Sequence, residues 1–121
     1  MPMTSRPSDI AVAFIDAFAR RDTAALAGYV ADDIVFESPQ VRLAGADAVV
    51  TAVGEFAQAV TGVSNVSVVG DDERAMIMYD METGPFGVIR AVDNIVVRNG
   101  KIVSDLLVFD TYEVRKATKG A

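Results

Sequence analysis

The second half of the chain contains two long segments in which both faces of an extended strand would be apolar. The first segment is residues 88–97, and the second begins at Ile102 and continues to Val114. In the first, one face carries Val88, Val92 and Val96, and the other carries Ile89, Ala91, Ile95 and Val97. An antiparallel sheet that is apolar on both faces must be covered on both faces. The chain therefore has to supply a layer of helices for one face and find a cover for the other.

The first half supplies that helical layer. Apolar residues recur at helical spacing after Ser8, which is a good N-cap, and this pattern runs to about Arg21. A second helix is predicted from Asp22 or Thr23, and a third over 46–60. A short strand is predicted at 34–36, and the period then changes to that of strands over 63–69, 75–83, 88–97 and 102–114. Helices followed by an antiparallel meander predict an α+β fold.

One face of this sheet stays uncovered after the helices are placed. The three helices can cover one face only, and no further helix is expected from the sequence. We therefore expect a homodimer that packs through the outer sheet face.

Composition excludes several kinds of chemistry. The 121 residues contain no His and no Cys, which excludes imidazole or thiolate catalysis, and we expect neither a metal nor a cofactor. Acid–base chemistry falls to carboxylates, tyrosines or lysines. The net charge of −6 argues against nucleic acid as a partner, because phosphate binding needs a basic face.

The length predicts one domain. We expect a disordered arm over 1–7, a single domain over 8–114 and a basic, solvated tail over 115–121. No apolar run is long enough for a membrane span, and the first residues lack the apolar stretch of a signal peptide. A cytoplasmic location is therefore expected.

Two stretches resemble SnoaL-like proteins of the nuclear transport factor 2-like superfamily. They are residues 14–36, which open with Phe14-Ile-Asp-Ala-Phe-Ala-Arg-Arg-Asp22, and residues 92–110, which contain Val92-Asp93-Asn-Ile-Val-Val-Arg-Asn-Gly-Lys. The resemblance implies a curved antiparallel sheet wrapped around three N-terminal helices, which forms a cone with a deep apolar pocket and is usually dimeric. Members include ketosteroid isomerases, polyketide cyclases and epoxide hydrolases.

The comparison with ketosteroid isomerases covers three functional groups. Those enzymes use an Asp base, a Tyr and a protonated Asp. The protonated Asp corresponds to Asp93, whereas the Asp base falls on Ser38 and the Tyr falls on Phe14. Two of the three groups are absent, so the usual ketosteroid isomerase mechanism is not expected.

Whether a second acid faces Asp93 depends on the hairpin turn at Arg98-Asn99-Gly100. A three-residue loop with a bulge at Gly100 would place Asp105 opposite Asp93 inside the pocket. A two-residue turn would pair Asp93 with Leu106 and send Asp105 to the other face. The resemblance favours the first register, in which the two acids would share a proton.

The candidate site combines acids with an apolar lining. The candidate catalytic residues are Asp93, Asp105 and Asp80, the last because the resemblance places the face of Met76, Met78, Asp80 and Glu82 on the pocket side. The candidate substrate-binding residues are Phe14, Phe18, Tyr29, Ser38, Phe56, Met76, Met78, Ala91, Ile95, Leu107 and Phe109.

Two functions remain open from the sequence. The first is a cofactor-independent enzyme that acts on a small, largely apolar steroid, polyketide or terpenoid by isomerisation, cyclisation or epoxide opening. In that hypothesis Asp93 donates a proton and Asp105 or Asp80 is the base. The alternative is a ligand-binding or dimeric interaction module without chemistry.

Overall fold

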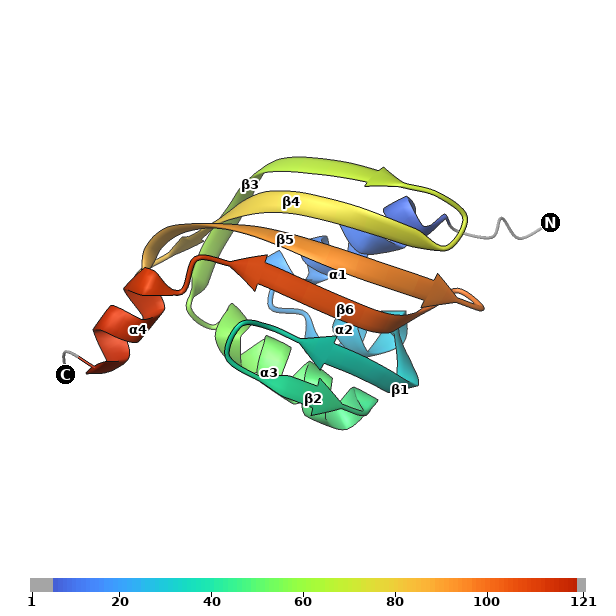
Figure 1. Ribbon diagram of the computed structural model, residues 1–121, viewed down its shortest axis with the longest axis horizontal. Coiled ribbons are helices and arrows are strands. Elements are labelled where there is room, and N and C mark those ends of the chain that lie inside the picture. Colours follow the sequence, from blue (N-terminus) through green and yellow to red (C-terminus); the bar gives the residue numbers. More distant parts are fainter. Residues whose placement is uncertain (1–5, 120–121) are drawn as a thin grey trace.

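The computed structural model describes residues 6–119, in which a helical layer packs against one curved sheet (Figure 1). The elements in chain order are α1 (Pro7–Ala19), α2 (Thr23–Tyr29), β1 (Val30–Glu37), β2 (Arg42–Ala44), α3 (Ala46–Ala57), β3 (Val60–Gly70), β4 (Arg74–Thr83), β5 (Gly87–Arg98), β6 (Lys101–Phe109) and α4 (Tyr112–Lys119). The expected α+β class and cone-like architecture are confirmed.

Local signals explain where the first two helices begin. Pro7 is the first residue of α1, where its missing N–H costs nothing, and Asp9 accepts a hydrogen bond from the backbone N–H of Arg6 at 3.3 Å. Asp22 caps α2 by accepting a bond from the Ala25 N–H at 3.0 Å.

The six strands form one mixed sheet in the order β2-β1-β6-β5-β4-β3. Every neighbouring pair is antiparallel except β1 and β6, which run parallel. The sheet was expected to be antiparallel throughout, so this pair is a departure. The parallel pairing is possible because α3 and four strands separate β1 from β6 in the sequence.

The concave face of the sheet forms the core together with the helices. Figure 1 shows the sheet curving around α1, with α3 beside β1 and β2. The inward side chains of β5 are almost fully buried and alternate with exposed or half-buried residues that point outward. This alternation defines an inner face toward the helices and an outer face away from them.

Both chain ends differ from the expected boundaries. Pro7 was expected in a disordered arm but is a buried residue of α1, whereas residues 1–5 lie outside the described part of the chain. Residues 115–119 were expected in a solvated tail but continue α4.

The described helices are too short or too polar to cross a membrane, since none in residues 6–119 has a long enough apolar window. The cytoplasmic location stays a prediction.

Candidate functional site

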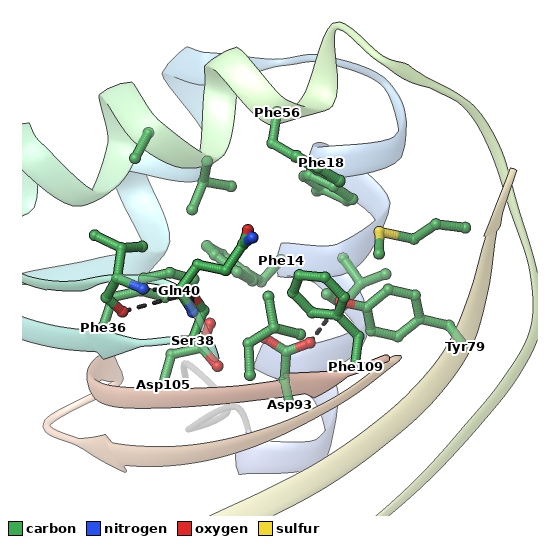
Figure 2. A pocket seen from close by; sticks show the side chains of 16 residues that line it. Phe14, Phe18, Phe36, Ser38, Gln40, Phe56, Tyr79, Asp93, Asp105 and Phe109 are labelled. Atoms are coloured by element: carbon green, nitrogen blue, oxygen red, sulfur yellow. Dashed lines mark hydrogen bonds between the residues drawn. The ribbon is translucent and has the colours of Figure 1, made fainter. Parts of the chain in front are cut away.

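A cavity of about 180 Å³ lies between the helices and the concave face of the sheet. Its lining comes from α1, the β1–β2 region, α3 and strands β4 to β6. The lining residues are Phe14, Ile15, Phe18, Phe36, Ser38, Gln40, Val41, Ala52, Val53, Phe56, Tyr79, Met81, Asp93, Asp105, Leu107 and Phe109 (Figure 2). The pocket is therefore apolar and rich in aromatic rings, with its carboxyl groups at one end.

The β5–β6 hairpin places both carboxyl groups in this cavity. Its turn is the two-residue kind, because Arg98 pairs with Lys101 and both Asn99 and Gly100 have positive φ, of 52° and 76°. The expected three-residue loop is therefore wrong. With this turn alone, Asp105 would face outward.

A bulge restores the inward direction of Asp105. Val97 pairs with Ile102 but Val96 pairs with Ser104, so Val103 is an extra residue in β6. The shift by one residue places Asp105 opposite Ile95 on the inner face, where it is 1% exposed. Asp93 pairs with Leu107, so the two acids are diagonal neighbours and not the directly opposed pair that was expected.

Tyr79 on β4 completes the polar end of the pocket. Its hydroxyl donates a hydrogen bond of 2.5 Å to Oδ1 of Asp93, and both residues are buried (Figure 2). Burial, followed by the negative charge of Asp93, raises the pKa of Tyr79 well above its ordinary value. The phenol therefore stays protonated and acts as a donor.

Asp105, unlike Asp93, has no hydroxyl or N–H group of the described residues that donates to it. Neither of its oxygens accepts a hydrogen bond from a donor group of residues 6–119, although its carboxyl lies within hydrogen-bonding reach of Asp93. Two ionised carboxylates have no proton to form that bond. The contact therefore forms only when one of the two acids is protonated.

The surroundings determine which acid keeps the proton. Burial, and then the charge of Asp93, raises the pKa of Asp105 well above its ordinary value. Burial also raises the pKa of Asp93, but hydrogen bonds from Asp105 and Tyr79 oppose this rise. Asp105 is thus the neutral acid of the pair and Asp93 the carboxylate.

Ser38 lies in the lining, but its hydroxyl is used in a turn. Its Oγ accepts the backbone N–H groups of Gln40 at 3.3 Å and Val41 at 3.2 Å. The side chain therefore holds the β1–β2 connection at the edge of the pocket.

The structure corrects the expected placement of Asp80, Met76 and Met78. Strand β4 pairs Ile77 with Asp93, and directly paired residues share a face. The alternate residues therefore point outward, where Met76 is 47% and Met78 is 41% exposed.

Asp80 is held in an ion pair on this outer face. It accepts bonds from Arg90 at 2.8 and 3.2 Å and from Asn65 at 2.9 Å. These bonds, led by the one from Arg90, lower the pKa of Asp80 to about 2. Asp80 is thus an outward-facing carboxylate and cannot act in the pocket.

The other candidate residues divide into two groups. The structure places Phe14, Phe18, Ser38, Phe56, Leu107 and Phe109 along the cavity. Ala91 and Ile95 point inward but are buried in the core, and Tyr29 packs against that core from α2. None of these three residues lines the cavity.

Some residues that line the cavity were not predicted from the sequence. They are Ile15, Phe36, Gln40, Val41, Ala52, Val53, Tyr79 and Met81. Phe36 lies directly beside Asp105 in the parallel pairing of β1 with β6, which the sequence does not show. Val53 carried a usable signal, because it precedes Phe56 by three residues on the apolar face of the third helix.

The described residues thus form a cone-like fold in which an apolar pocket between the helices and the sheet contains a pair of acids. The family model described as a SnoaL-like domain matches residues 11–105, and the chain belongs to this family. No curated protein matches the sequence.

Solved structures share this fold. A protein from Kribbella flavida DSM 17836 is 31% identical with a TM-score of 0.89, over 98% of this chain and 97% of that one. A candidate polyketide cyclase from Pseudomonas putida KT2440 is 14% identical with a TM-score of 0.81, over 91% and 96%. A candidate isomerase from Bacillus subtilis is 16% identical with a TM-score of 0.77, over 95% and 94%.

Proposed function

We propose that this protein binds a small, largely apolar carbonyl compound and isomerises or cyclises it by cofactor-independent acid–base chemistry. Steroid-, polyketide- and terpenoid-type compounds are the candidate classes. The observation that carries the proposal is a pair of buried acids, Asp93 and Asp105, at the polar end of an apolar pocket. The similarity to a candidate isomerase and a candidate polyketide cyclase supports the same reaction class.

The two acids have different roles in this proposal. When the ligand binds, the Asp105 proton turns from Asp93 to the ligand carbonyl oxygen, and this hydrogen bond stabilises the negative charge that develops there. Asp93, with its carboxylate held by Tyr79, removes a proton from the adjacent carbon. This reverses the roles expected from the sequence, in which Asp93 was the donor.

The reaction balances without a cofactor. The C–H bond breaks, its electron pair forms the enolate, and the proton moves to Asp93. Return of that proton to a different carbon gives an isomer and regenerates the carboxylate. Attack of the enolate carbon on a second carbonyl of the same molecule forms a ring, and the resulting alkoxide then takes up the proton.

Hydrogen exchange at the carbon next to a carbonyl tests this proposal without knowledge of the natural substrate. Small ketones are incubated with the protein in D₂O, and loss of the α-proton signal is followed by NMR. We expect catalysed exchange, which Asp93→Asn lowers by about 100-fold or more because it removes the base. Asp33→Asn is the matched control, since Asp33 is exposed on β1.

Exchange at the uncatalysed rate with every ketone, or unchanged exchange in Asp93→Asn, contradicts the proposed chemistry. Binding of a ketone without exchange would instead support the alternative function, a ligand-binding module without a reaction.

We also propose that the outer sheet face pairs with a second copy of the chain. Exposed apolar side chains gather on this face of β3 to β6, and they include Val69, Met76, Val88 and Val108 at 47–68% exposure. The Asp80–Arg90 ion pair at the same face is neutral overall. A sheet face with several exposed apolar side chains is suited to self-association.

A further inference from the structure

The size of the cavity limits the ligand that it can enclose. Its volume is about 180 Å³. An apolar cavity of about 150 Å³ encloses benzene, whereas sites for drug-sized ligands are about 300–1,000 Å³. The pocket therefore has room for one ring with a few further atoms, and a four-ring skeleton does not fit inside it.

The aromatic lining limits the shape of the ligand. The rings of Phe18 and Phe56 are stacked with an interplanar angle of 6°, and Phe86 continues the stack behind Phe56 at 10°. Phe18 and Phe56 both line the cavity, so part of its wall consists of two nearly parallel aromatic rings. Such rings favour a planar aromatic ligand, which can pack against them in an offset or edge-to-face arrangement.

The polar end limits the charge of the ligand. The residues that line the cavity include two acids and neither Lys nor Arg. An anionic ligand would meet the Asp93 carboxylate with no cation to compensate, at a large cost in a buried site. Asp105 is 1% exposed and accepts no hydrogen bond from the described residues, and its own proton can turn from Asp93 to an acceptor on the ligand.

We propose that the ligand is a single-ring compound of about ten non-hydrogen atoms that carries a carbonyl group and no anionic group. This inference rests on the proposed function and adds the size, planarity and charge of the substrate. Within the candidate classes it selects one-ring compounds and excludes an enclosed steroid.

Three probes separate size from charge. Acetophenone and benzoate have the same ring and the same number of non-hydrogen atoms, but acetophenone is neutral and benzoate is anionic. Acetylpyrene keeps the acetyl group of acetophenone on four fused rings. Binding is followed by NMR through the methyl signals of Met81 and Leu107, which line the cavity.

We expect acetophenone to shift both methyl signals in a saturable way, and benzoate to bind at least about tenfold more weakly. Acetylpyrene should leave both signals unchanged. Asp93→Asn should narrow the gap between the affinities for acetophenone and benzoate, because it removes the carboxylate that an anionic ligand would meet in the pocket. Asp33→Asn should match the unmodified protein.

Three results would overturn the inference: no saturable binding of acetophenone, binding of benzoate as tight as that of acetophenone, or binding of acetylpyrene in the cavity. These results are independent of turnover. Acetophenone binding without α-proton exchange would leave the inference intact and remove only the proposed chemistry.

Discussion

Asp105 is a buried acid whose two oxygens receive no hydrogen bond from the donors in residues 6–119. Folding withdraws this carboxyl from water and places it beside Asp93, which raises its pKa. The folded chain therefore binds a proton more tightly than the unfolded chain does. Stability is lost as pH rises from the ordinary carboxyl value toward the raised value, at about 1.4 kcal/mol for each unit of difference.

We predict that Asp105→Asn stabilises the protein at pH 8 and has a much smaller effect at pH 4. The Asn amide can still donate to Asp93 but cannot ionise, so the variant avoids the cost of burying a second charge. Urea unfolding at the two pH values measures the difference in the free energy of unfolding. A variant that is less stable than the unmodified protein at pH 8 would contradict this explanation.

Part of this site could be predicted from single residues. Asp93 and Asp105 were expected in one pocket, and the structure places both there. Asp80 was assigned to the wrong face of β4 and Tyr79 was missed, because Met76, Ile77, Met78 and Tyr79 are all compatible with a buried face. The pairing of β4 with β5 decides between the two faces, and no local pattern shows this pairing.

At the scale of elements, the β5–β6 hairpin determines what the pocket contains. A two-residue turn and the bulge at Val103 together turn Asp105 inward. Each feature alone would reverse the faces of β6 from Ser104 onward. This turn requires a left-handed backbone conformation at residue 99. Asn adopts that conformation more readily than most residues with a Cβ.

We predict that Asn99→Ala lowers the free energy of unfolding by about 1 kcal/mol, because Ala at a positive φ is strained. Asn99→Gly should be close to neutral, since glycine adopts this conformation freely. Urea unfolding of the two variants measures the difference. Equal stabilities would contradict a strained turn at this position.

Sequence periodicity predicts most of the elements. It does not predict β2, which depends on long-range pairing, or α4, which contains few apolar residues. The three-residue strand β2 is too short to show a period, and its pairing partner β1 provides its place in the sheet. Helix α4 has few apolar residues, of which Val114 is 8% exposed, so its sequence resembles a basic tail.

At the scale of the molecule, the helices cover one face of the sheet and leave the other exposed (Figure 1). Met78 lies on that outer face and is 41% exposed. Val12 on α1 is similarly exposed, at 40%, but lies in the helical layer on the other side of the sheet. These two residues provide a matched pair for the proposed dimer.

We predict that Met78→Lys raises the dimer dissociation constant at least about tenfold, because each copy would bury an unpaired ammonium group. Val12→Lys should leave it unchanged. Sedimentation velocity over a range of protein concentrations measures both. A monomer mass for the unmodified protein at every concentration would contradict the dimer itself.

The central claim is that Asp93 and Asp105 share one proton inside an apolar pocket. A pH titration of the aspartate carboxyl carbons by ¹³C NMR tests it most directly, with Asp105→Asn to assign the signal. The account predicts that the Asp105 carboxyl loses its proton at a pH well above the ordinary aspartate value of about 4, because burial and the charge of Asp93 raise its pKa. Titration of both Asp93 and Asp105 near 4 would contradict the claim.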